Sequence, residues 1–290
     1  MYPRIQSRWH PPPQGTHNRS LADDNPRLPR FAAGTLIAIC VGVVLGVALL
    51  APAVSIPRWP WDIKPFNARF IGVFYLAGWL GALYAAFSGR ISPARGFILE
   101  AAVFTGVATL ASVIHRGSFL AERPVAVAVW WITYIGFCSA LIFSARLVSR
   151  SPGPGLPPTT GRRQLRDLYA LGTTAYGLAL FLAPAAATAF WPWPVDAFHA
   201  RVYSGIFFAG TAVLWGLRRR AAAADLAMAG LLQTVLGLGA IWGTWSIDQT
   251  AQRVAWSTPG TWIWLILFGG MALAGLGMLA EARSLRSRGG

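Results

Sequence analysis

An element rich in tryptophan and proline occurs twice in the chain and carries much of its polar chemistry. The first copy begins with Trp59-Pro60-Trp61 and ends at Arg69, and the second begins with Trp191-Pro192-Trp193 and ends at Arg201. Guanidinium groups bind anions, and aromatic walls exclude water around them. The pattern predicts either an outer vestibule that binds an anionic group or a pair of interfacial anchors, because tryptophan also favours the headgroup layer of a bilayer.

The two copies differ at polar positions inside the element. Asn67 of the first copy corresponds to His199 of the second, and Lys64 corresponds to Asp196. A vestibule built from both copies would therefore be pseudo-symmetric in shape and asymmetric in chemistry. The candidate binding residues of the two elements are Trp59, Trp61, Asn67, Arg69, Trp191, Trp193, His199 and Arg201.

Glu100 is an acidic residue inside a long apolar segment, about five residues from the predicted start of its helix. A carboxylate within a membrane span is a candidate functional group. Its near-counterpart in the second half, allowing a shift of one residue, is Gln233. Both are candidate binding residues. Three roles stay open for Glu100: a pair with Arg95 near the interface, a site of proton or cation coupling, or a catalytic acid.

Several kinds of enzyme and pigment are excluded by residue type and spacing. Lys64 is the single lysine and lies in a polar loop, so the chain has neither a Gly-Lys-Ser/Thr phosphate loop nor an intramembrane Schiff-base lysine. Cys40 and Cys138 lie in apolar runs without a C-x-x-C motif, which argues against a disulfide framework or a thiol redox pair. No G-x-S-x-G nucleophile motif is present.

The histidines do not predict a haem. His10 and His17 lie in the N-terminal tail, while His115 and His199 lie at predicted outer helix ends. Haem ligation within a bilayer requires histidines that face each other from inside the helices. A metal site of His115 and His199 with Asp196 or Asp248 is a minor alternative. We therefore expect no catalytic residue, no metal and no cofactor.

Composition indicates a membrane protein, because 55% of the residues are hydrophobic and 12% are charged, against roughly 25% charged residues in soluble proteins. Apolar runs of about 17 to 25 residues mark transmembrane helices. Eight such runs predict an all-α, polytopic fold, and they cover residues 31–53, 69–88, 95–114, 125–146, 168–190, 200–217, 222–245 and 261–280.

The basic residues predict the orientation of these spans. The chain has 25 Lys plus Arg against 10 Asp plus Glu, a net charge of +15. Sorted by loop from a cytoplasmic N-terminus, 18 basic residues lie on the cytoplasmic side and 7 on the other. Both termini are therefore expected in the cytoplasm, with anionic lipid headgroups as partners and no nucleic acid. The sequence identifies no protein partner and no oligomeric state.

The chain contains an internal duplication. A shift of 132 residues aligns Leu50–Gly78 with Leu182–Gly210 and gives 12 identities in 29 positions. The duplication predicts two parallel four-helix repeats related by an axis along the membrane normal. The expected boundaries are a disordered basic, proline-rich tail, a first repeat, a cytoplasmic linker, a second repeat and a basic C-terminal tail; they are 1–30, 31–148, 149–166, 167–282 and 283–290.

The repeated elements from Trp59 to Arg69 and from Trp191 to Arg201 resemble the tryptophan-proline elements of uncharacterised bacterial multi-pass membrane proteins. The resemblance covers the two elements and the helices after them, and it transfers no catalytic residue. It implies a location in a bacterial cell membrane.

The sequence predicts a transporter or a membrane protein that binds a small ligand or lipid, since parallel repeats can enclose a substrate pathway. The alternative is a non-transporting structural or assembly subunit of a membrane complex, for which interfacial tryptophans and small-residue packing suffice. An intramembrane enzyme is third, because the predicted helices lack a dense set of polar residues.

Overall fold

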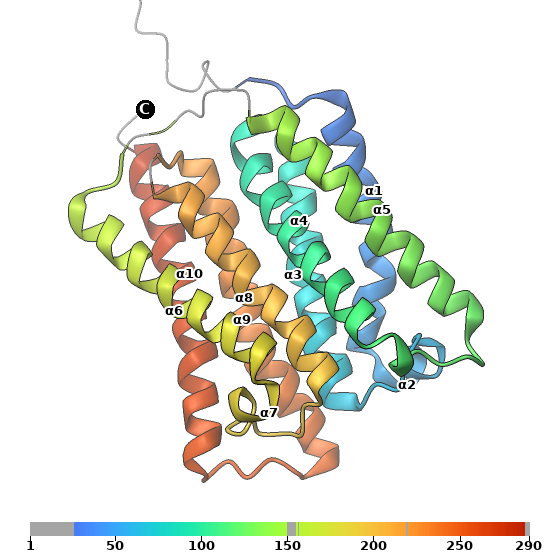
Figure 1. The fold of residues 1–290 in the computed structure, drawn as a ribbon. Helices are drawn as coiled ribbons and strands as arrows, with labels where there is room; N and C mark the ends of the chain where they lie inside the picture. Colours follow the sequence, from blue (N-terminus) through green and yellow to red (C-terminus); the bar gives the residue numbers. More distant parts are fainter. Residues whose placement is uncertain (1–25, 150–154, 156, 219, 288–290) are drawn as a thin grey trace, which may run out of the picture.

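The computed structural model describes residues 26–149, 155, 157–218 and 220–287, and this part of the chain folds into a helical bundle (Figure 1). The long helices are α1 (Arg30–Val47), α3 (Pro65–Ser88), α4 (Ile91–Ile114), α5 (Pro124–Ser149), α6 (Thr160–Leu182), α8 (Ala197–Leu217), α9 (Ala223–Ala251) and α10 (Pro259–Ser287). The short elements are η1 (Ala48–Leu50), α2 (Pro52–Ser55), η2 (Ile56–Arg58), η3 (Arg116–Ser118) and α7 (Pro184–Ala187). The predicted disordered tail lies almost entirely outside the described residues.

Seven of these helices are long and apolar enough to cross a membrane, namely α1 continued by η1, α3, α4, α5, α8, α9 and α10. Such helices indicate a multi-pass membrane protein. The remaining predicted span, 168–190, falls on α6 and does not meet this criterion. Arg162, Arg163, Arg166 and Asp167 occupy the first two turns of α6, and the helix ends at Leu182, before Pro184.

Helix α6 nevertheless lies along the full length of α8. At one end, Arg166 donates a hydrogen bond of 3.0 Å to the carbonyl oxygen of Leu217 at the end of α8. At the other end, Arg201 of α8 donates one of 3.1 Å to the carbonyl oxygen of Phe181. Leucines on the opposite side of α6 are exposed; they are Leu165, Leu168, Leu171, Leu178 and Leu182.

The two halves of the chain pack against each other through two pairs of helices, each with one helix from either half, which we call the crossed helix pairs. Helix α3 packs against α9, and α4 packs against α8. The helices α2, α3 and α4 begin at Pro52, Pro65 and Ile91, and α7, α8 and α9 begin 132 residues later at Pro184, Ala197 and Ala223. The duplicated sequence therefore starts equivalent helices at equivalent positions.

The ends of the bundle have different composition. One end contains the turn between α3 and α4, where the backbone of Arg90 forms an isolated antiparallel bridge with the backbone of Arg27. The end of α10 lies there too, and Arg286 donates a hydrogen bond to the hydroxyl of Tyr84. Both ends of the described chain lie here (Figure 1). The opposite end contains both tryptophan elements, and there Trp61 forms an isolated bridge with Phe119. We call it the tryptophan end.

The last helix of each half packs differently on its neighbour. In the second half, glycines bring α9 and α10 into backbone contact: a Cβ atom added at Gly237 would lie 2.6 Å from the nitrogen of Ala272, and one at Gly230 would lie 2.7 Å from the oxygen of Gly275. The residues 132 positions before Gly230 and Gly237 are Ile98 and Thr105. The glycines that allow the close approach of α10 to α9 are therefore not repeated at the equivalent positions of α4.

Candidate functional site

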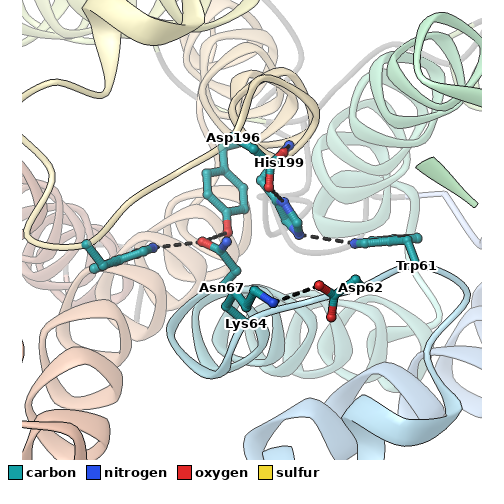
Figure 2. A network of polar contacts seen from close by, with 8 residues as sticks. Trp61, Asp62, Lys64, Asn67, Asp196 and His199 are labelled. Atoms are coloured by element: carbon teal, nitrogen blue, oxygen red, sulfur yellow. Dashed lines mark hydrogen bonds and ion pairs between the residues drawn. The ribbon is translucent and has the colours of Figure 1, made fainter. Parts of the chain in front are cut away.

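The two tryptophan elements exchange hydrogen bonds across the middle of the molecule. The indole nitrogen of Trp61 donates to Nε2 of His199 at 3.1 Å, and that of Trp193 donates to Oδ1 of Asn67 at 2.7 Å. Trp61 and Trp193 are equivalent in the duplication, and so are Asn67 and His199. The tryptophan of each half therefore donates a hydrogen bond to the residue at the same position of the other half (Figure 2).

Aromatic stacking repeats this exchange. Phe66 stacks on Trp193 at a centroid distance of 5.6 Å, and the equivalent Phe198 meets Trp61 edge to face at 5.0 Å. The side chains of Trp61, Trp193, Asn67 and His199 are all buried. We call these four residues, with Asp196 and Tyr203, the tryptophan junction. Because the bonds from Trp61 to His199 and from Trp193 to Asn67 are buried, the junction joins the halves of the molecule.

Asp196 fixes the orientation of the His199 ring. Its carboxylate accepts hydrogen bonds of 2.6 Å from Nδ1 and 2.9 Å from the backbone nitrogen of His199 (Figure 2). Partial burial opposes ionisation, but these bonds and the histidine together lower the pKa of Asp196 to about 2. The indole of Trp61 can only donate, so Nε2 of His199 is an acceptor and its proton is on Nδ1. No lone pair of this imidazole remains for a substrate or metal.

The two arginines of the repeated elements have different partners. The guanidinium of Arg69, in the second turn of α3, lies 5.2 Å from the centre of the Trp242 ring on α9. The guanidinium of Arg201 donates a hydrogen bond of 2.7 Å to Nε2 of His115 at the end of α4. Burial and the charge of Arg201 lower the pKa of His115 and keep this imidazole a neutral acceptor. Each arginine thus binds the neighbouring helix of the other half.

A cavity of about 700 Å³ lies between the helices of the first half and is closed on its inner side by α8 and α9. Pockets of this size hold drug-sized ligands. Its wall is mainly aromatic and apolar, and the aromatic residues are Trp59, Phe74, Tyr75, Phe97, Phe104, Trp130, Tyr134 and Phe137. Its polar residues include Glu100 and Gln233, after which we call it the Glu100 cavity.

The Glu100 cavity reaches the surface at the tryptophan end and on the outer side of α1 and α5. Arg58, Glu122 and Arg123 line it at the tryptophan end. Arg123 donates hydrogen bonds to the carbonyl oxygens of Ile56 and Trp59, which ties down the loop at this mouth. Leu45, Val54, Val125 and Val129 line the cavity and are also exposed. Apolar side chains therefore form its rim toward the lipid.

Glu100 lies deeper in the bundle than the sequence predicts. Helix α4 begins at Ile91, because Pro93 is tolerated in its first turn, and Glu100 is the tenth residue of the helix. At 1.5 Å per residue it is roughly 14 Å from the start of α4. No hydrogen bond or ion pair joins its carboxylate to any described residue, and Arg95 binds the carbonyl oxygen of Val148 instead.

Gln233 reaches the Glu100 cavity from α9. Its side-chain oxygen accepts a hydrogen bond of 2.9 Å from the hydroxyl of Tyr169 on α6, and the residue is buried. The hydroxyl groups of Tyr75 and Tyr134 form a short hydrogen bond across the cavity. The sequence analysis did not predict this aromatic lining; tyrosines within apolar spans are the sequence feature that could have indicated it.

The structure divides the candidate binding residues into separate groups. Trp59, Glu100 and Gln233 line the Glu100 cavity. Trp61, Asn67, Trp193 and His199 form the tryptophan junction, beside which Trp191 stacks on Tyr203 at 5.3 Å. Arg69 and Arg201 lie at the crossed helix pairs. The described residues contain no group of three His, Cys, Asp or Glu side chains placed to hold a metal ion.

No protein-family model, no curated protein and no solved structure matches the chain.

Proposed function

We propose that the protein is an eight-span membrane protein that binds a small ligand or lipid in the Glu100 cavity, as a transporter or as a ligand-binding membrane protein. The observation that carries the proposal is the cavity itself, with about 700 Å³ of space inside the first half. An assembly role does not require an internal space of this size, whereas an aromatic wall with few polar groups is typical of ligand sites.

The proposed arrangement as two parallel repeats fits this function. The crossed helix pairs, the equivalent helix starts and the exchanged bonds of the tryptophan junction all follow a twofold relation between the halves. The twofold relation does not hold for the last helix of each half. In the second half, glycines allow α10 to pack closely on α9, whereas in the first half α5 lines a cavity. In this proposal the second repeat is closely packed and supports the first repeat, which contains the ligand site.

The same relation supports α6 as the eighth span, with both termini in the cytoplasm and the tryptophan end outside. We predict that Asp62→Cys and Pro194→Cys, in a background with Cys40 and Cys138 replaced by alanine, react with an impermeant maleimide from one side of the membrane. Thr159→Cys, just before α6, should react from the opposite side. If Thr159→Cys and Pro194→Cys reacted from the same side, α6 would not cross and the eight-span proposal would be wrong.

A cavity-filling variant tests the ligand site. Gly78 lines the cavity, and a Cβ atom there would have no neighbour within 4 Å, so Gly78→Leu fills space without displacing the backbone. We predict that Gly78→Leu weakens binding of the neutral probe N-phenyl-1-naphthylamine at least tenfold. Binding would be measured by equilibrium dialysis of the protein in nanodiscs, with empty nanodiscs subtracted.

The matched control is Gly136→Leu on α5. Gly136 also has no neighbour within 4 Å of an added Cβ atom, and it is exposed outside the cavity lining. Gly136→Leu should bind the probe like the unmodified protein. Absence of saturable binding to the unmodified protein, or equal binding by both variants, would contradict a ligand site and favour the structural or assembly subunit.

A further inference from the structure

We infer that the ligand of the Glu100 cavity is a lipophilic organic monocation whose positive centre binds the carboxylate of Glu100. This inference rests on the proposed function, because it names the chemical class that the same cavity takes. It follows from the position of Glu100, the distribution of the other charges, and the nature of the wall and rim.

The first observation is that Glu100 lacks a compensating protein charge. Its carboxylate lies near the middle of α4 and forms no hydrogen bond or ion pair with a described residue. A lone carboxylate in the apolar interior of a membrane protein is strongly unfavourable. A cationic ligand placed against it would remove this penalty, and the empty volume beside Glu100 gives such a ligand room.

The second observation concerns the basic residues of the cavity, Arg58 and Arg123. Both lie at the mouth, where Arg58 donates to the carbonyl oxygen of Val54 and Arg123 donates to those of Ile56 and Trp59. Glu122 lines the same mouth. Glu100 lies 14 residues before the end of α4, roughly 21 Å along the helix from the tryptophan end. Among the described residues, the deep part of the cavity is therefore lined by the carboxyl group of Glu100 and by no basic side chain.

The third observation is the wall around the carboxylate. Phe97, Phe104 and Tyr134 line the cavity with Glu100, and Trp59 and Trp130 line it closer to the mouth. Aromatic faces attract cations, and the attraction increases when the cation is desolvated. The exposed apolar rim between α1 and α5 suits entry from the bilayer. A ligand that fits all these features carries one positive charge inside an apolar envelope.

Two probes of the same shape and opposite charge test this inference: tetraphenylphosphonium and tetraphenylborate. The full chain would be placed in nanodiscs of zwitterionic lipid, and binding would be measured by equilibrium dialysis with empty nanodiscs subtracted. We expect saturable binding of tetraphenylphosphonium. Glu100→Gln should weaken it at least tenfold and leave tetraphenylborate binding unchanged or stronger.

Two further variants control the experiment. Asp62→Asn removes an exposed carboxylate at the tryptophan end that does not line the cavity, and it should change tetraphenylphosphonium binding less than threefold. Glu100→Asp keeps the charge and should retain most of the affinity, which distinguishes loss of the charge from loss of the fold. Equal affinity of the unmodified protein and Glu100→Gln for the phosphonium, or equal loss in Asp62→Asn, would overturn the inference.

The neutral probe distinguishes this failure from failure of the proposed function. If Glu100→Gln and the unmodified protein bind N-phenyl-1-naphthylamine equally and Gly78→Leu binds it at least tenfold more weakly, the cavity is a ligand site, whatever the phosphonium result. If the neutral probe binds in that way and the phosphonium shows no dependence on Glu100, only the charge class is wrong. If neither probe binds, the ligand site itself is absent.

Discussion

Replacement of Gly237 by alanine is expected to destabilise the protein more than any other single-methyl change in α9. The added Cβ atom would lie against the carbonyl oxygen of Phe268 and 2.6 Å from the nitrogen of Ala272. Both are backbone atoms of α10, so no side-chain rotation can relieve the contact, and the helices must move apart. Overpacking of this kind reduces the free energy of unfolding by typically about 1–3 kcal/mol, and we expect the upper part of that range.

Thermal unfolding in detergent, followed by tryptophan fluorescence, would measure the effect. The matched control is Gly270→Ala on α10, where an added Cβ atom has no neighbour within 4 Å. Alanine favours helix over glycine, so Gly270→Ala should leave the melting temperature unchanged or slightly higher. Equal melting temperatures for Gly237→Ala and Gly270→Ala would show that α9 and α10 do not touch at Gly237.

The class of fold could be predicted from composition, because a 30 Å hydrocarbon layer requires long apolar helices whatever their packing. The prediction is confirmed for seven helices. The eighth predicted span, on α6, is not among them, because four charged residues in its first two turns leave only a short apolar stretch before Pro184. From the sequence alone, Arg166 and Asp167 could be assigned only to a loop before the predicted span. In the structure they pair with Glu281 of α10 and Arg218.

The candidate site was predictable in its residues and not in its arrangement. The duplication places Trp61 and Trp193, and Asn67 and His199, at equivalent positions. That each tryptophan reaches the other copy depends on α3 packing against α9 and α4 against α8, and helix periodicity alone does not specify which helices cross. The Glu100 cavity depends on the same packing, and Thr105, which lines it, lies at the position where the second half has Gly237.

The depth of Glu100 shows how a small error in a helix boundary changes an interpretation. A start at Arg95 puts the carboxylate near the interface, where Arg95 could pair with it. The actual start at Ile91 adds four residues, about 6 Å, and Arg95 binds the end of α5 at Val148. The carboxylate then lines the Glu100 cavity without a hydrogen bond or ion pair to any described residue, which makes it the centre of the proposed ligand site.

The second large effect is expected at Asn67. Its side-chain oxygen accepts two buried hydrogen bonds, 2.7 Å from the indole of Trp193 and 2.9 Å from the hydroxyl of Tyr203. Asn67→Leu would leave both donors buried without an acceptor. Each buried donor without a partner costs about 1–3 kcal/mol, so we expect the free energy of unfolding to fall by about 2–4 kcal/mol in total. Trp193→Phe should cost less, because Asn67 then still accepts from Tyr203.

The sign of the stability change caused by a second substitution, Tyr203→Phe, distinguishes this mechanism from a loss of packing. In the unmodified protein, Tyr203→Phe removes a hydrogen bond to Asn67 and should lower stability. In the Asn67→Leu background the same change removes a hydroxyl that has lost its acceptor, so it should raise stability or leave it unchanged. Chemical unfolding of the four variants in detergent would give the coupling energy. If Tyr203→Phe lowered stability equally in both backgrounds, the Tyr203 hydroxyl would not depend on Asn67 as its acceptor, and the explanation by unpaired buried donors would be wrong.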